Sequence, residues 1–451
     1  MACCAWIGGM NPWAAELAAA VRARDARVGV IGLGYVGLPF AAASASAGFA
    51  VTGFDIDATK IASLIAGNSY VDAVSDDALA RMGDRFKATS DFTQLADCQV
   101  IVICVPTPLD AQRAPDLSFV VGTARTIAAH VRPGTLVVLE STTWPGTTEE
   151  VLVPILAESA LVPGRELFLA FSPEREDPGN ATFGTRSIPK VVAGSGQEAG
   201  DLAEAFYAAV VERVVRVGDT RTAEAVKITE NIFRAVNIAL VNELKLVFDA
   251  MGIDIWEVID AAATKPFGFM PFYPGPGLGG HCIPIDPFYL AWKAREFEAP
   301  TRFIELAGEI NTAMPKHVVA RLREIVDRDS GQGLSGAEIL LVGIAYKKNV
   351  SDMRESPAMK LMQLMELAGA RVSFLDPHVP EIPPMRDYGQ YEKRVALDAA
   401  GLIPGRFAAV LIATDHDAID YAALLGLECP VVDTRNAIAR RGLPGERVIK
   451  V

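Results

Sequence analysis

A stretch rich in glycine and proline, GPGLGGHCIPIDPFYL at residues 275–290, contains a candidate reactive cysteine, although a lone cysteine is more often structural. Cys282 follows His281 there and stands four residues before Asp286. A reacting thiol needs a nearby base or orienting group and backbone that approaches a ligand closely, as glycines such as Gly279 permit. The pattern predicts a nucleophilic Cys282 served by Asp286, with His281 as a local hydrogen-bonding residue.

Other polar residues stand where chemistry is expected. Lys227 and Asn231 are four residues apart and therefore share one face of a predicted helix. Glu174 and Thr143 follow predicted strands, where the ligands of doubly wound folds bind. Each has a structural alternative, a solvated helix edge for the pair and a local backbone cap for the threonine. Glu176 is interpreted as a surface charge.

The segment GLGYVG places three glycines directly after a strand and at the start of a helix. The first permits a tight turn, the second lets a pyrophosphate approach the backbone, and the third allows close packing of helix on strand. Asp55 ends the next strand, where a carboxylate binds a ribose diol and repels a 2′-phosphate, which favours NAD over NADP. The predicted cofactor-binding residues are Gly32, Gly34, Tyr35, Val36, Gly37, Asp55, Lys60, Thr107 and Thr143.

Composition excludes several classes of protein. Of 451 residues, 51% are hydrophobic and 22% charged, which is too apolar for a disordered chain. The net charge of −13 comes with no basic face, so nucleic acid is not an expected partner. The six cysteines lack CxxC spacing, which argues against a disulfide framework or zinc site and favours a reducing cytoplasm.

The apolar runs and the N-terminal stretch give three further expectations. No apolar run approaches 18 uncharged residues, so no membrane span is predicted. The apolar start lacks a basic n-region and is a poor signal peptide, with initiation at Met10 as an open alternative. Asn11 is positioned to cap a short helix that runs to Arg24.

The elements that must position these residues form three segments after an N-terminal extension, residues 1–26. Residues 27–218 read as short, buried strands alternating with helices, starting with a βαβ unit that calls for a parallel sheet. Residues 219–328 are predicted to be helical, beginning with one long helix that suits a connecting or dimer-forming role. Residues 329–451 repeat the strand–helix–strand pattern. The expected fold is α/β, with two doubly wound Rossmann-like domains joined by a helical middle.

Taken as a set, the motifs GLGYVGLP, ESTTWPGTT, SPERE, GGHCIPID, YKKNVSDMRES and ATDH resemble the UDP-glucose/GDP-mannose dehydrogenase family from Arg27 to Val451. The resemblance implies an NAD-binding domain at 27–218, a central domain with the cysteine loop at 219–328, and a UDP-sugar-binding domain at 329–451. It also implies a homodimer. The implied reaction oxidises a sugar C6 alcohol to the acid with two NAD reduced, in the synthesis of surface polysaccharides such as capsule or lipopolysaccharide.

By this resemblance, Cys282 holds the sugar as a thiohemiacetal and then a thioester. Lys227 stabilises the oxyanion, Asn231 adds a donor, and Asp286 is a general base. Glu174 assists hydrolysis and Thr143 positions water. The implied substrate-binding residues are Glu174, Lys227, Asn231, Gly279, Lys347 for the UDP portion, and Arg435 for the sugar or phosphates, across a subunit boundary in the family. No metal is expected.

The substrate is the most open point. GPGLGGHCIPIDPFYLAWKA looks most like the branch that acts on UDP-N-acetylhexosamines, with UDP-N-acetylglucosamine expected first. UDP-glucose dehydrogenases often carry an arginine upstream of the glycine loop, whereas Phe269, Phe272 and Tyr273 stand here, and an apolar site suits an N-acetyl methyl. UDP-N-acetylgalactosamine, UDP-N-acetylmannosamine and UDP-glucose stay open. More distant alternatives are a two-electron hydroxyacid dehydrogenase and a non-catalytic nucleotide-sugar-binding protein.

Overall fold

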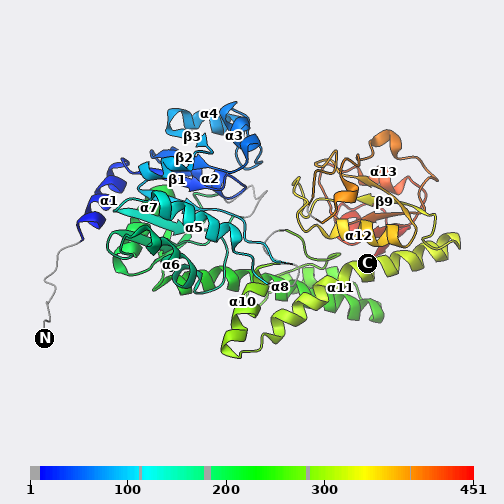
Figure 1. Ribbon diagram of the computed structural model, residues 1–451. Helices are drawn as coiled ribbons and strands as arrows, with labels where there is room; N and C mark the ends of the chain where they lie inside the picture. The colour runs from blue at the N-terminus through cyan, green and yellow to red at the C-terminus, as the bar shows by residue number, and fades with distance from the viewer. Residues whose placement is uncertain (1–10, 111–113, 177–183, 281–284, 386) are drawn as a thin grey trace. The chain divides into compact units, whose positions relative to one another are not determined.

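The computed structural model describes residues 11–110, 114–176, 184–280, 285–385 and 387–451 (Figure 1). The chain divides into two compact units, the first containing residues 1–230 with 292–298 and the second residues 231–291 with 299–451. Within the described residues, no helix is both long enough and apolar enough to cross a bilayer.

The first unit is built on an eight-stranded sheet of order β3-β2-β1-β4-β5-β6-β7-β8. Its strands are almost wholly buried, as expected for a sheet covered on both faces. One pairing departs from the all-parallel prediction, because β6 and β7 run antiparallel. The strands are β1 (Arg27–Ile31), β2 (Ala50–Phe54), β3 (Phe86–Thr89), β4 (Val100–Ile103), β5 (Thr135–Leu139), β6 (Leu167–Phe171), β7 (Lys190–Gly194) and β8 (Val214–Arg216).

Helices complete this unit. The predicted N-terminal helix is present as α1, where the Asn11 side chain accepts a hydrogen bond from the Trp13 N–H, and it packs against α7. Buried residues of α1, α2 and α7 belong to one core with the sheet. The helices are α1 (Pro12–Ala23), α2 (Gly37–Ser46), α3 (Ala58–Ile65), α4 (Asp76–Met82), α5 (Ser118–His130), α6 (Val153–Leu156) and α7 (Gln197–Val210).

The second unit carries a five-stranded, wholly parallel sheet of order β10-β9-β11-β12-β13. Two apolar clusters cover its opposite faces. The elements are β9 (Glu338–Val342), α12 (Pro357–Leu367), β10 (Arg371–Leu375), β11 (Ala409–Ile412), α13 (Tyr421–Leu425), β12 (Val431–Asp433), α14 (Ala437–Arg440) and β13 (Val448–Lys450). Two parallel-type sheets with long helices between them in sequence confirm the predicted fold class. The short strands β3, β8 and β13 were not predicted.

The helical middle contains the predicted long helix, α8 (Thr220–Met251), of 32 residues. It ends before Gly252, which has φ of +72°. Helix α9 (Ile255–Ala263) then begins separately, capped by the Asp254 side chain. Helices α10 (Asp286–Ala294) and α11 (Arg302–Ser330) follow, and α11 accommodates an internal proline, Pro315.

A buried chain of amide groups fixes the start of the glycine-rich loop within the second unit. Asn242 of α8 accepts a hydrogen bond from the Gly275 N–H at 3.0 Å and donates to Asn311 of α11 at 2.9 Å. Asn311 in turn donates to the Ala235 carbonyl at 3.1 Å. Because each amide both donates and accepts, the chain has a single direction, and it joins α8, α11 and the loop.

We therefore predict that Asn242→Ala lowers the free energy of unfolding by about 2 kcal/mol or more, since it leaves two buried polar groups without partners. Asn237→Ala is the matched control, because Asn237 lies on the same helix and its side chain donates to the Phe233 carbonyl at an exposed position. Denaturant titration measures both. Equal effects of the two substitutions would contradict the role given to the buried chain.

Candidate active site

The glycine turn after β1 has the geometry predicted for phosphate binding. Gly32 has φ of +90°, and a Cβ there would lie 2.5 Å from the Cys104 carbonyl oxygen, so no other residue fits. A Cβ on Gly37 would lie 1.9 Å from the Gly32 oxygen, which makes the third glycine equally necessary. Gly34 instead faces open space, with no atom of the described residues within 4 Å of an added Cβ. The backbone at the second glycine is thus accessible to a ligand.

Asp55 ties this turn to the end of β2. Its carboxylate accepts hydrogen bonds from the Leu33 N–H at 2.9 Å and from the Asp57 N–H at 3.0 Å, and the side chain is buried. Lys60 lies 3.6 Å from the same carboxylate. The residue predicted to bind ribose therefore also shapes the turn, a role that the sequence pattern alone did not indicate.

The remaining predicted cofactor residues surround the same edge of the sheet. Tyr35 and Val36 lie in the turn before α2, and Thr107 is buried in the segment after β4, on the other side of the point where the strand order reverses. The Thr143 hydroxyl, after β5, is buried and has no hydrogen-bond partner among the described residues. An open glycine backbone, a strand-end carboxylate and an orphaned hydroxyl fit NAD, which binds at such a switch point.

A buried ion pair joins the second group of predicted residues. Lys227 of α8 lies 3.2 Å from Glu174, which follows β6, and both side chains are about 6% exposed. The Glu176 N–H donates to the other oxygen of Glu174. Glu176 is not the fully solvated surface charge that was expected, because this residue is partly buried, accepts a hydrogen bond from Thr185, and burial raises its pKa to about 7.

The next turn of α8 carries Asn231, which donates to the Asp286 carboxylate at 2.5 Å within the second unit. Both side chains are buried. Asp286 is the first residue of α10, where its negative charge is favourable to the helix dipole. Cys282 and His281 lie outside the described residues, so the proposed nucleophile has no structural description here.

The two glycines before the described residues break off, Gly279 and Gly280, pack closely against side chains of the second unit. A Cβ on Gly279 would lie 2.8 Å from Tyr346 and 2.9 Å from Pro357, and one on Gly280 would lie 2.9 Å from the Tyr346 ring. Gly280 also donates its N–H to the Arg354 carbonyl. The loop backbone thus packs directly on the segment that follows β9, and this segment contains the partly buried Lys347.

Arg435, which follows β12, lies against the other end of the loop. Its Nε donates to the Ala413 carbonyl at 2.8 Å, and a Cβ on Gly275 would lie 2.5 Å from its Nη1. Gly275 is therefore small to leave room for the guanidinium. The predicted Lys347 and Arg435 both follow strands of the five-stranded sheet, at its carboxyl edge.

The aromatic segment that replaces the arginine of UDP-glucose dehydrogenases is largely used in packing. Phe272 and Tyr273 join an apolar cluster around Trp256, and the Tyr273 hydroxyl donates to Asp260 at 2.6 Å. Phe269 is 41% exposed. Packing alone thus accounts for two of the three aromatic residues, which weakens their value as evidence for an N-acetyl site.

Comparison with known proteins agrees with this arrangement. Three family models match in order: the NAD binding domain of the UDP-glucose/GDP-mannose dehydrogenase family at residues 26–211, its central domain at 221–313 and its UDP binding domain at 340–440. A UDP-N-acetyl-D-glucosamine 6-dehydrogenase of Pseudomonas aeruginosa is 36% identical over 81% of this chain and 86% of its own length.

A UDP-N-acetyl-D-mannosamine dehydrogenase of Pyrococcus horikoshii is 34% identical over 86% of this chain and 89% of its own. The solved structure of the UDP-D-ManNAc dehydrogenase from Pyrococcus horikoshii aligns with a TM-score of 0.81 at 33% identity, covering 91% of this chain and 96% of that one. The chain belongs to the UDP-glucose/GDP-mannose dehydrogenase family. It is an NAD-dependent nucleotide-sugar 6-dehydrogenase with an NAD binding domain and a UDP binding domain.

Within this family member, sequence reasoning missed two buried carboxylates. Glu140, at the end of β5, pairs with Lys190 at 2.9 Å and accepts from the Tyr207 hydroxyl at 2.5 Å. Glu224 of α8 accepts from the Thr148 N–H and hydroxyl at 2.8 and 2.7 Å. The partners in each case lie 50 or more positions apart in the chain, so no local pattern pointed to them.

We predict that Asp55→Ala weakens NAD binding by about tenfold to a hundredfold, since a hydrogen bond to a charged group contributes about 1.5–3 kcal/mol. Titration of NAD into the purified protein measures this. Asp57→Ala is the control, because the Asp57 side chain caps α3 through the Thr59 N–H without contacting the glycine turn. Unchanged NAD affinity in Asp55→Ala would limit Asp55 to its structural bond with Leu33.

Proposed function

We propose that this enzyme oxidises the C6 alcohol of a UDP-N-acetylhexosamine to the uronic acid in two steps, with UDP-N-acetylglucosamine as the first candidate. The observation that carries the proposal is the presence of two buried polar pairs, Lys227 with Glu174 and Asn231 with Asp286, whose α8 members are one helical turn apart. Burial of four such groups is costly for stability alone and is typical of reaction chemistry.

The two-step oxidation explains the need for a cysteine. In the first step the alcohol loses a proton and a hydride to give the aldehyde. The Cys282 thiolate then adds to the aldehyde carbon, forming a thiohemiacetal that loses a second hydride and becomes a thioester. Water cleaves the thioester, giving the acid and restoring the thiol. When bound, NAD accepts one hydride in each oxidation.

Lys227 is assigned to oxyanion stabilisation. An ammonium group that is already buried interacts strongly with charge developing on the sugar C6 oxygen, because little water screens it. Glu174 holds that ammonium at 3.2 Å and is in turn fixed by the Glu176 N–H, so the lysine is oriented before substrate binds. Glu174 is also assigned to thioester hydrolysis, with water held by the buried hydroxyl of Thr143.

Asp286 is assigned as the general base for the alcohol or the attacking water, and Asn231 as its positioning partner. The Asn231 amide donates to one carboxylate oxygen, which orients the other. A hydrogen bond of this kind stabilises the ionised form that a base requires. The nucleotide end is assigned to Lys347 and Arg435, whose cations suit phosphate oxygens.

UDP-N-acetyl-D-mannosamine is the second candidate substrate. It is supported by the similarity of this chain to the Pyrococcus horikoshii dehydrogenase over most of both chains. The two sugars differ in the configuration of one carbon, and both share the C6 alcohol and the UDP group. The mechanism above applies equally to both, so the choice depends on direct measurement.

A homodimer through the helical middle is part of the proposal. Apolar side chains on α8 are exposed in the single chain, including Leu240 at 53%, Val247 at 47% and Met251 at 63%. Leu306 of α11 is also exposed, at 52%. Apolar side chains repeated along long helices are typical of subunit interfaces.

We predict two NADH per molecule of limiting UDP-N-acetylglucosamine when NAD is in excess, because four electrons leave the sugar as two hydrides. The absorbance of NADH measures the yield, and the other UDP-sugars are run in parallel. One NADH per sugar would contradict the thioester route. No NADH with this sugar but two with UDP-N-acetylmannosamine would retain the mechanism and change the substrate.

We further predict that Cys282→Ser binds NAD as the unaltered enzyme does but forms almost no acid, because a hydroxyl is a poorer nucleophile and its ester a poorer leaving group. Mass spectrometry of the variant after incubation with substrate tests for a trapped ester. Cys429→Ser is the control thiol, since burial raises the pKa of Cys429 to about 11. Acid formation at the normal rate by Cys282→Ser would remove this cysteine from the chemistry.

A further inference from the structure

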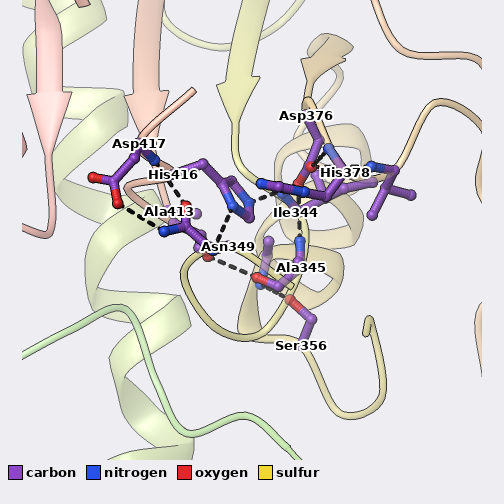
Figure 2. Close-up of polar contacts among 12 residues, drawn as sticks. Ile344, Ala345, Asn349, Ser356, Asp376, His378, Ala413, His416 and Asp417 are labelled. Carbon is purple, nitrogen blue, oxygen red and sulfur yellow. Dashed lines mark hydrogen bonds and ion pairs between the residues drawn. The ribbon is translucent and has the colours of Figure 1, made fainter. Parts of the chain in front are cut away.

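The second unit has its own switch point. In the order β10-β9-β11-β12-β13, the chain adds β10 on one side of β9 and then adds β11, β12 and β13 on the other side. The switch point therefore lies between β9 and β11, and ligands of such sheets bind beside the loops that follow these two strands. Those loops are residues 343–349 and 413–417. Figure 2 shows the polar contacts that join them.

The turn after β9 repeats the construction of the NAD turn. Gly343 has φ of +76°, and an added Cβ would lie 2.1 Å from the Thr414 carbonyl oxygen, just as Gly32 faces the Cys104 carbonyl in the first unit. Gly343 donates its N–H to the last residue of β10 at 2.8 Å, and Gly32 does the same to the last residue of β2.

The carboxylate at the end of the second strand is repeated as well. Asp376 follows β10 as Asp55 follows β2, and it too accepts hydrogen bonds from the residue after the loop glycine and from the residue two positions after itself. Those bonds come from the Ile344 N–H at 2.7 Å and the His378 N–H at 2.8 Å. The same two-point attachment therefore fixes the first loop in both units.

The two carboxylates differ in how many donors surround them. Asp376 also accepts from the Ala345 N–H and the Val379 N–H, both at 3.1 Å, and its Oδ2 lies 3.1 Å from Nε2 of the fully buried His416. Five donors fill the roughly four lone-pair positions of a carboxylate. Asp376 consequently has no acceptor capacity left for a ribose diol.

The neighbours of His416 fix its tautomer. Its Nδ1 accepts a hydrogen bond from the Asn349 N–H at 2.9 Å, so the ring proton is on Nε2 and is donated to Asp376. The His416 ring thus connects β10 to the end of the loop after β9. Figure 2 shows the ring between the two partners.

Asn349 adds a second connection between the loops. Its side chain donates to the Asp417 carboxylate at 2.7 Å and accepts from the Asp417 N–H at 2.9 Å. Asn349 has φ of +60°, a conformation that asparagine tolerates better than most residues. Lys347 stands two positions earlier in this same turn, so the path of the turn sets where its ammonium is presented.

We propose that His416 is a positioning residue of the nucleotide-sugar site. The His416 ring donates to the Asp376 carboxylate at the position that corresponds to the one a ribose hydroxyl would use on Asp55. Through its hydrogen bond with Asn349, the ring also holds the turn that contains Lys347 in the form that binds the UDP group. The inference rests on the proposed role of Lys347 and on the UDP binding domain. It also accounts for a Rossmann-like unit that receives a nucleotide sugar and not a dinucleotide.

The test measures the affinities for UDP and for NAD separately, by calorimetry on the full-length enzyme. We expect His416→Ala to weaken UDP binding by about tenfold or more, the change associated with lost hydrogen bonds of this kind, and to leave NAD affinity within about twofold. His416→Gln keeps a donor for Asp376 near the position of Nε2, but its amide oxygen lies at the same end of the side chain and not at the position of Nδ1 that the Asn349 N–H meets. Its UDP affinity should therefore fall between those of His416→Ala and the unaltered enzyme.

Glu366→Gln controls for general loss of stability in the second unit, because it breaks the Arg394–Glu366 ion pair without touching either loop. Equal UDP affinity in the unaltered enzyme and both His416 variants would overturn the inference, as would an equal loss in Glu366→Gln. If His416→Ala does not fold, His416→Gln alone decides between these results.

The inference and the proposed function can fail separately. An unaltered enzyme that binds UDP but yields one NADH per sugar would reject the proposed function and leave this inference standing, whereas one that binds no UDP would reject both.

Discussion

A carboxylate that follows the second strand of each βαβ unit accepts hydrogen bonds from backbone N–H groups of the turn after the first strand. The shape of the first turn in both units depends on this interaction. Asp55 and Asp376 each hold a turn whose glycine lies too close to a neighbouring carbonyl for any side chain. Parallel pairing brings the carboxyl ends of the strands to one edge, so the turn, the carboxylate and the next loop along meet there. The groups around the two carboxylates differ, because Lys60 lies 3.6 Å from Asp55 whereas Nε2 of His416 lies 3.1 Å from Asp376.

Helix α8 contributes polar groups that are assigned to the reaction, and it places them by a different route. Lys227 and Asn231 are placed by the helical repeat, but their partners Glu174 and Asp286 come from distant parts of the sequence. Each buried charge or amide is matched by a partner within hydrogen-bond distance, which compensates the cost of removing it from water. The buried amides Asn242 and Asn311 are matched in the same way, and they hold the loop before the cysteine. Because these groups are neutral, they fix the direction of the hydrogen bonds and not the position of a charge.

The packing of the glycine-rich loop explains part of its composition without reference to a ligand. Gly279 and Gly280 meet Tyr346 and Pro357, and Gly275 leaves room for Arg435. The loop is therefore built against the same segment that carries Lys347. Residues assigned to the sugar end and to the nucleotide end of the substrate are linked through this contact.

The sequence by itself determined the fold class, the glycine turn after β1 and the long helix, because these depend on short-range periodicity and spacing. It also predicted a site suited to thiol chemistry, which stays a prediction. It also placed Lys227 and Asn231 on one helix face. Only the tertiary structure decided that Glu176 is partly buried with a raised pKa, that β7 runs antiparallel to β6, and that Phe272 and Tyr273 belong to a packed cluster. It alone revealed that His416 completes the shell of Asp376, since those residues lie 40 positions apart and hydrogen bonding between distant segments leaves no local pattern.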